Sequence, residues 1–246
     1  MKHLVAYITA GLPEKSFTVD LALALGENGV DSIELGIPFS DPVADGPIIE
    51  KAGLLALEKG LRFRDVLEIS AQIAPKVDTL WMGYFNSFYQ YGIDALLKKA
   101  KEIGISGLII PDLPHEEALA YKRAFDTNGV SNIVFVAPTD SAVRIEEIVR
   151  DAKKFIYLVA YTGITGSGES EDLQPIITSI KTHTATPVYV GFGVNAKTAK
   201  DKAAGADGVI VGSAFVNILL QEDLTLSQKM EQCCAIASEI KQKINE

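Results

Sequence analysis

Apolar and polar positions follow two periods along this chain, and the two periods alternate. Short and nearly continuous apolar runs, such as 107–110 and 208–211, are typical of parallel strands covered on both faces. Between them, apolar residues recur three or four positions apart, which predicts amphipathic helices at 16–28, 93–103, 116–128 and 144–153, among others. The predicted strands are 3–9, 31–37, 78–84, 106–111, 132–137, 155–161, 187–191 and 207–212.

Eight strand–helix units in 246 residues predict an α/β protein with the (β/α)8 or TIM-barrel fold. Two helices are additional to the repeat, namely 48–59 after the second strand and a long helix at 226–244. The alternative is an open doubly wound sheet, which favours a glycine fingerprint directly after the first strand, where residues 9–13 form only a turn. No linker interrupts the pattern, so we expect one domain over 1–246.

Composition narrows the class of partner. The net charge is −9, whereas proteins that follow a nucleic-acid backbone need clustered Lys and Arg, so we expect no nucleic-acid partner. No apolar run approaches the ~20 residues of a membrane span. The cysteines, Cys233 and Cys234, are adjacent in a helical stretch, which favours a reduced compartment and predicts a cytoplasmic protein.

Carboxylates gather around the second predicted strand and the loop after it. Glu34 lies inside the apolar strand, and Asp41 and Asp45 lie in the proline-rich segment 38–47. Two carboxylates in unlike environments can hold different protonation states, as general acid–base catalysis requires. The alternative is that Glu34 pairs with a buried Lys or Arg, while the two aspartates bond their own turn.

In a barrel the chemistry lies at the carboxyl ends of the strands. The residues delivered there are largely apolar and aromatic, a lining that suits a flat hydrophobic group. The alternative is that some of these aromatic side chains only fill the barrel. The predicted rim consists of Tyr7, Thr9, Glu34, Met82, Tyr84, Ile109, Asp112, Ala137, Tyr157, Tyr161, Gly191, Phe192, Gly193, Gly212 and Ser213.

Glycines mark the ends of the last three strands. They occur in the 162–168 segment, at Gly193 and at Gly212, and the last two lead directly into helices. Free N–H groups at such turns, with the positive end of a helix dipole, make a phosphate site, usual at this place in a barrel. The alternative is that these glycines only permit tight turns.

The rim lacks two common catalytic devices. No lysine falls at the carboxyl end of a predicted strand, where a Schiff base would need it, and His3, His115 and His183 do not cluster with carboxylates as metal ligands would. Acid–base catalysis by Glu34 and Asp45 without a metal is what remains.

The run at 34–47, ELGIPFSDPVADGP, resembles the signature of the tryptophan synthase α subunit family. Further blocks at 7–13, 82–86, 111–114, 163–166, 191–194 and 212–213 are similar to later family motifs in the same order. The resemblance implies a lyase that splits indole-3-glycerol phosphate into indole and glyceraldehyde 3-phosphate. It also implies a β-subunit partner in an α2β2 complex, whose pyridoxal phosphate joins indole to serine, with no cofactor in this chain.

The resemblance also implies roles for individual residues. Glu34 and Asp45 are then the catalytic acids, with Glu34 as the proton shuttle and Asp45 accepting a hydrogen bond from the indole N–H. Asp41 and Thr165 are expected in loop closure or partner contact, with 162–170 closing over the phosphate. The expected substrate-binding residues are Tyr7, Met82, Tyr84, Ile109, Tyr157, Thr165 and Phe192, and the phosphate-binding residues are Gly166, Gly193, Gly212 and Ser213.

Three alternatives stay open at this point. Another barrel lyase or isomerase of a sugar phosphate would share the phosphate site. A regulatory subunit without catalysis would bind indole-like phosphates and stimulate a partner. A scaffold needs neither the acids nor the glycines at one rim.

Overall fold

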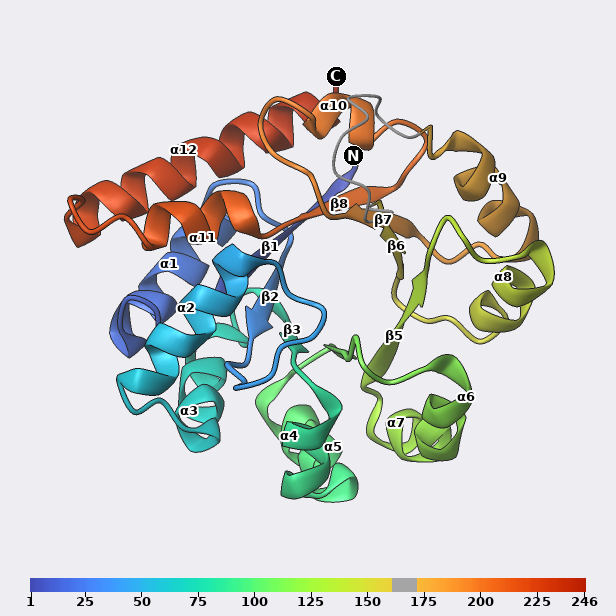
Figure 1. Cartoon of the computed structure of the whole chain (residues 1–246), viewed down its shortest axis with the longest axis horizontal. Coiled ribbons are helices and arrows are strands. Elements are labelled where there is room, and N and C mark those ends of the chain that lie inside the picture. Colours follow the sequence, from blue (N-terminus) through green and yellow to red (C-terminus); the bar gives the residue numbers. More distant parts are fainter. Residues whose placement is uncertain (161–171) are drawn as a thin grey trace.

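Eight parallel strands close into a barrel in the order β1 to β8 (Figure 1). The computed structural model of the chain describes residues 1–160 and 172–246, and it confirms the (β/α)8 architecture predicted from the sequence. The strands are β1 (His3–Thr9), β2 (Ser32–Gly36), β3 (Asp78–Met82), β4 (Gly107–Ile109), β5 (Ser131–Val136), β6 (Ile156–Val159), β7 (Val188–Gly191) and β8 (Gly208–Val211).

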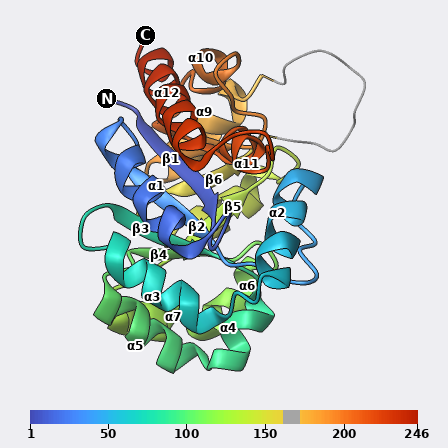
Figure 2. The same cartoon turned by 90° about the vertical axis from the view of Figure 1, so that its left-hand side faces the viewer.

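Helices surround the barrel, and both additional helices are present. α2 follows the loop of residues 38–45, which carries Asp41 and Asp45 and is called the acidic loop below, and Figure 2 shows α2 on the side of the barrel opposite to the two chain ends. α12 packs along α1, α10 and α11. The helices are α1 (Lys15–Glu27), α2 (Pro47–Glu58), α3 (Phe63–Ile73), α4 (Phe85–Tyr91), α5 (Ile93–Ile103), α6 (His115–Ala118), the 3-10 turn η1 (Leu119–Tyr121), α7 (Lys122–Asn128), α8 (Ala142–Val149), α9 (Gln174–His183), α10 (Ala199–Lys202), α11 (Ser213–Leu219) and α12 (Leu226–Ile244).

Several predicted elements have other bounds in the structure: the helix predicted at 144–153 is α8 (Ala142–Val149), for example, and the strand predicted at 155–161 is β6 (Ile156–Val159). The third strand ends at Met82 rather than at residue 84, because Tyr84 is already the N-cap residue of α4. The helix predicted over 116–128 is divided into α6, η1 and α7. The ring of Tyr121, at the end of η1, packs on Phe85 with centroids 5.4 Å apart, so a tertiary contact replaces regular helix there.

Large rings fit inside the barrel because they lie against glycines of neighbouring strands. A Cβ atom on Gly36 would lie 2.2 Å from the Tyr7 hydroxyl oxygen, far inside van der Waals contact. The same close approach of a tyrosine ring to a glycine recurs in two other pairs of neighbouring strands. A Cβ atom on Gly191 would lie 2.2 Å from Tyr157 Cε1, and one on Gly208 would lie 2.7 Å from Tyr189 Cδ1.

The first two strands and the loop after β2 place the acids. Tyr7 of β1 pairs in register with Glu34 of β2, and every residue of β2 is buried. At the end of the loop, Asp45 directly precedes Gly46, the N-cap residue of α2. Pro47 occupies the first helical position, where its missing N–H costs nothing. Within the described residues, no helix combines the length and the hydropathy needed to cross a bilayer.

Candidate active site

A cavity of about 250 Å³ opens at the carboxyl ends of the strands. It joins the acidic residues of β2 and its loop to the glycines after β7 and β8, which lie far apart in the sequence. The described lining consists of Tyr7, Glu34, Asp45, Gly46, Ile49, Met82, Tyr157, Phe192, Gly193, Val194, Asn195, Ile210, Gly212, Ser213, Ala214 and Asn217.

Glu34 is the buried acid of the cavity. Its side chain is 3% exposed, and Oε2 has no hydrogen-bond partner among the described residues. Glu34 forms no ion pair with a Lys or Arg among the described residues. The alternative that Glu34 only pairs with a buried cation is therefore not observed. Burial, with a smaller contribution from the charge of Asp45, raises the pKa of Glu34 to about 8. The carboxyl is therefore mainly neutral at pH 7.

Asp45 is the second acid, and it is half-buried. Burial raises the pKa of Asp45 to about 6, a hydrogen bond from the Tyr84 hydroxyl opposes that rise, and the charge of Glu50 adds to it. Asp45 thus stays largely ionised at pH 7 while Glu34 is largely protonated. Asp41 is exposed, accepts a hydrogen bond from the Ser40 hydroxyl and does not line the cavity in the described structure.

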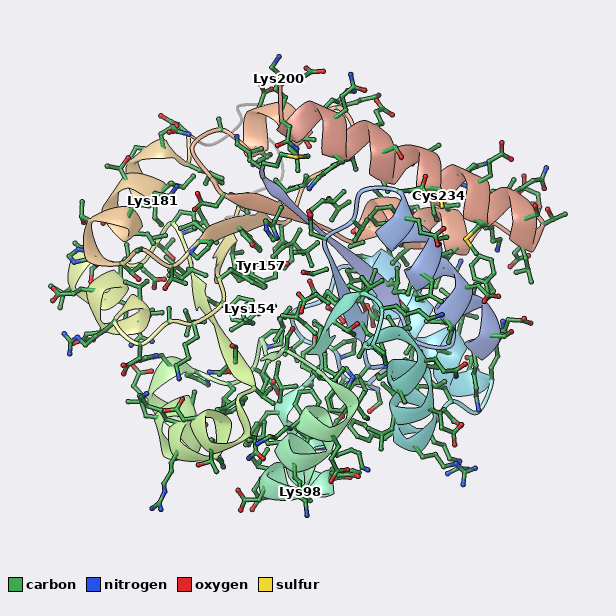
Figure 3. All side chains as sticks on the ribbon, turned by 180° about the vertical axis from the view of Figure 1, so that it is seen from behind. Lys98, Lys154, Tyr157, Lys181, Lys200 and Cys234 are labelled. Atoms are coloured by element: carbon green, nitrogen blue, oxygen red, sulfur yellow. The ribbon has the colours of Figure 1, made fainter. Side chains whose placement is uncertain are left out.

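Aromatic rings form one wall. Tyr157 lies near the centre of the barrel (Figure 3), stacked on Phe135 with ring centroids 4.9 Å apart. The ring centroid of Phe192 lies 6.1 Å from that of Tyr157, and Phe192 is 40% exposed. Tyr7, 6% exposed, completes the wall above Gly36. A flat apolar group entering the cavity would meet rings and the Met82 side chain.

Another part of the cavity lining consists of small residues. Gly193 has φ of +70°, a conformation that favours glycine, and Gly212 and Ser213 mark the start of α11. The described lining contains neither Lys nor Arg, and the sequence has none between 161 and 171. A phosphate held here would be bound by neutral donors.

Several predicted site residues lie elsewhere. Tyr84 and Ile109 are each 1% exposed and are not part of the described cavity lining, so their direct contact with a substrate stays a prediction. Tyr161, Thr165 and Gly166, with the 162–170 loop, lie outside the described residues.

The cavity also contains residues that the sequence analysis missed, namely Ile49, Asn195, Ile210 and Asn217. A signal existed for two of them. Ile210 precedes Gly212 by two positions, the spacing that puts residues on one face of a strand. Asn217 follows Ser213 by four, the spacing that aligns residues on one face of a helix.

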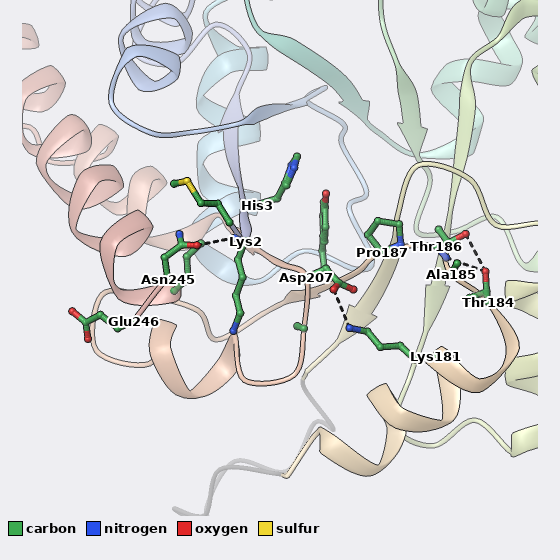
Figure 4. Close-up of a pocket in the computed structure, with 14 residues that line it drawn as sticks. Lys2, His3, Lys181, Thr184, Ala185, Thr186, Pro187, Asp207, Asn245 and Glu246 are labelled. Carbon is green, nitrogen blue, oxygen red and sulfur yellow. Dashed lines mark hydrogen bonds and ion pairs between the residues drawn. The ribbon is translucent and has the colours of Figure 1, made fainter.

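A larger cavity, about 890 Å³, lies at the other end of the barrel (Figure 4). Its polar groups bond one another: Lys181 pairs with Asp207 at 2.9 Å, and the Lys2 N–H donates to Asn245 at 2.8 Å. Neither catalytic candidate reaches this cavity, so the described structure gives it no acid–base pair resembling Glu34 and Asp45.

Comparison with known proteins agrees with the geometry. The family model described as "Tryptophan synthase alpha chain" matches residues 1–245. The tryptophan synthase alpha chain of Wolinella succinogenes is 56% identical over 246 residues, covering 100% of this chain and 96% of that relative. The one from Thermoanaerobacter sp. is 40% identical and covers 98% of this chain and 93% of the relative.

Solved structures lead to the same family. The tryptophan synthase subunit alpha from Campylobacter jejuni superposes with a TM-score of 0.87 at 35% identity, covering 96% of this chain and 95% of that one. Tryptophan synthase from M. tuberculosis in a ligand-free form gives a TM-score of 0.88 at 32% identity, with 100% and 94% coverage. The chain described here therefore belongs to the tryptophan synthase alpha chain family.

Proposed function

We propose that this chain cleaves indole-3-glycerol phosphate to indole and glyceraldehyde 3-phosphate by acid–base catalysis. Family membership makes the chain a lyase of tryptophan biosynthesis. The observation that carries the finer proposal is the pairing of two unlike carboxyls in one cavity. Glu34 is buried without an ion pair and is mainly neutral, while Asp45 beside it is mainly ionised.

These protonation states match the proton movements of the cleavage. Neutral Glu34 donates its proton to the indole carbon that bears the glycerol chain, and Asp45 accepts from the indole N–H as positive charge develops in the ring. The Glu34 carboxylate then takes the proton of the adjacent glycerol hydroxyl. The carbon–carbon bond breaks, its electron pair returns to the indole ring, and the aldehyde forms. Glu34 ends protonated as it began, so one residue serves as acid and as base.

The rest of the cavity suits the two ends of this substrate. Tyr7, Met82, Tyr157 and Phe192 supply the apolar wall that an indole needs. Gly193, Gly212 and Ser213 supply close backbone approach and a hydroxyl for the phosphate.

We extend the proposal to the assembly. Solved relatives of this chain are described as tryptophan synthase, one of them in an aminoacrylate-bound form. Alpha chains of this enzyme need no cofactor, and the pyridoxal phosphate belongs to the β subunit. We therefore expect this chain to act as one barrel domain in a cytoplasmic α2β2 complex, with Asp41 and its exposed loop on the face from which indole leaves.

The test measures release of indole from indole-3-glycerol phosphate by the purified chain, alone and with a cognate β subunit. Glu34→Gln is expected to slow release at least ~100-fold, as loss of a general acid–base group does, with substrate binding retained. Glu27→Gln, at an exposed position near the end of α1, is the matched control and is expected to leave release unchanged.

The outcomes separate the candidate functions. Full activity in Glu34→Gln would contradict its catalytic role. No release by the unaltered chain, with the phosphate ligand still bound, would favour another sugar-phosphate enzyme. Stimulation of the β subunit that persists in Glu34→Gln, without cleavage by the unaltered chain, would favour a regulatory subunit.

A further inference from the structure

Tyr84 contacts the acidic loop and not the cavity. It follows β3 by two residues, and its side chain is 1% exposed. Its ring stacks on Phe39, at the beginning of the loop, with centroids 5.4 Å apart and planes at 21°. Its hydroxyl accepts a hydrogen bond from the Ala44 N–H at 3.1 Å, next to Asp45, and its effect on the Asp45 carboxyl is to lower the pKa.

These contacts attach the loop to the barrel, together with the packing of Phe39 and Ala44 against the core. Within the described part of the chain, the hydrogen bonds that reach residues 38–45 from outside the loop come from Tyr84 alone. Tyr84 is itself fixed through the next residue, because the Phe85 N–H donates to Asp112 Oδ1 at 2.8 Å. Hydrogen bonds thus connect the segment after β4 with the residue that follows Tyr84, and Tyr84 with the loop.

We propose that Tyr84 is a positioning residue for Asp45, fixing the loop that carries this carboxylate and holding the carboxylate in its charged form. The inference rests on the proposed function, and it gives Tyr84 a different task from the expected contact with the indole ring. A hydroxyl that accepts from a backbone N–H is well oriented to donate its own proton to the neighbouring carboxylate.

The surrounding charges explain why such a donor matters. Burial and the charge of Glu50 favour the neutral form of Asp45, and the hydrogen bond from Tyr84 lowers the pKa of Asp45 against them. Burial also raises the pKa of Tyr84, so this hydroxyl keeps its proton wherever the enzyme works. The titratable groups that face Asp45 or Tyr84 from the elements around them are Tyr7 of β1, Glu34 of β2, Glu50 of α2, Asp112 after β4 and Tyr157 of β6.

The test replaces Tyr84 by Phe, which keeps the ring and removes the hydroxyl. We expect kcat for indole release to fall about 10-fold, the effect of one lost hydrogen bond to a charged group, with the acidic limb of the pH profile moving up by about 0.5–1 pH unit. Titration of the Asp45 carboxyl by 13C NMR in the ligand-free chain is expected to show the same upward shift. That readout needs no substrate, so it also decides the inference if the chain fails to release indole.

Phe39→Leu is the matched control, because it removes the ring stacking and leaves the hydroxyl in place. It is expected to leave the Asp45 titration unchanged. An unchanged Asp45 titration in Tyr84→Phe would overturn the inference. So would equal losses of kcat in both variants with unmoved titration, because Tyr84 would then act only through packing.

Discussion

The rings of Tyr157 and Phe192 lie with centroids 6.1 Å apart and planes inclined by 59°. Phe192 reaches this position with φ of 69°, in the left-handed region that non-glycine residues rarely adopt. Such a conformation costs about 1–2 kcal/mol and persists where the surroundings fix it, most often at functional sites. The strain thus agrees with a ring placed for the substrate.

Two substitutions of Phe192 separate the contribution of its aromatic ring from the strain of its backbone conformation. Phe192→Ala and Phe192→Gly both remove the aromatic surface, so both are expected to raise KM for the substrate about 10-fold. Glycine adopts φ near 69° without strain, so Phe192→Gly is expected to be more stable than Phe192→Ala by about 1 kcal/mol in urea unfolding. Equal stability would show that the backbone is not strained at this residue.

The two acids predict a bell-shaped pH profile for indole release. Asp45 must be ionised, so activity is expected to fall as the pH drops below about 6. Glu34 must be protonated at the start, so activity is expected to fall as the pH rises above about 8. The measurement is kcat/KM over the range between and beyond these values, because kcat/KM reports the pKa values of the free enzyme, and its maximum is expected between them.

Asp45→Asn tests the coupling between the acids. The charge of Asp45 helps to raise the pKa of Glu34, so its removal is expected to move the basic limb of the residual activity to lower pH. The overall rate is expected to drop ~100-fold or more with the loss of the charge that stabilises the ring. A basic limb that stays in place would mean that burial alone sets the Glu34 proton affinity.

Glu34 also predicts an unusual dependence of stability on pH. Its pKa rises from 4.5 to about 8 on folding, so its neutral form is favoured in the folded state. The contribution of this neutral carboxyl to the free energy of unfolding is fully present below pH 4.5 and is lost as the pH rises towards 8. Glu34→Gln is therefore expected to be more stable than the unaltered chain at pH 8, on the order of 3 kcal/mol, and nearly equal to it at pH 5.

Urea unfolding at both pH values measures this difference. The control is again Glu27→Gln, whose exposed side chain is expected to give the same small change at each pH. A difference between Glu34→Gln and the unaltered chain that does not vary with pH would contradict the raised proton affinity.

Gly36 predicts a steric effect inside the barrel. Gly36→Ala would place a Cβ atom 2.2 Å from the Tyr7 hydroxyl, and such overpacking is expected to destabilise the fold by about 1–3 kcal/mol. Gly53→Ala, inside α2, is the control, because the nearest atom to a Cβ there is Pro38 Cα at 3.9 Å, an ordinary contact. In a Tyr7→Leu background the cost of Gly36→Ala is expected to shrink, and an unchanged cost would show that the clash lies elsewhere.

Sequence periodicity predicted the barrel well because buried parallel strands have a strong apolar signal. β1 and the helices α5 and α12 coincide with their predicted bounds. The third strand and the 116–128 helix were less predictable, because the contacts that end them join residues distant in sequence. Local pattern contains no information about such contacts.

The same distinction applies to the site. Glu34 could be singled out from the sequence because a carboxylate within an apolar strand is conspicuous without any structure, whereas the role expected of Asp45 came from the resemblance of segment 34–47 to the family. The position of Tyr84 could not be predicted, because a rim tyrosine pointing into the cavity and one pointing under the loop have the same sequence signature. Ile49 enters the cavity only through the direction in which α2 leaves the loop.

The pairs of tyrosine and glycine inside the barrel have a consequence for the history of the chain. Each ring occupies the volume that a side chain on the neighbouring strand would need. A mutation that enlarges Gly36 is expected to cost less together with one that shrinks Tyr7, and the same holds for Gly191 with Tyr157 and Gly208 with Tyr189. In evolutionary terms these positions are expected to covary as size-matched couples, each spanning two adjacent strands, so the barrel interior diverges in paired steps.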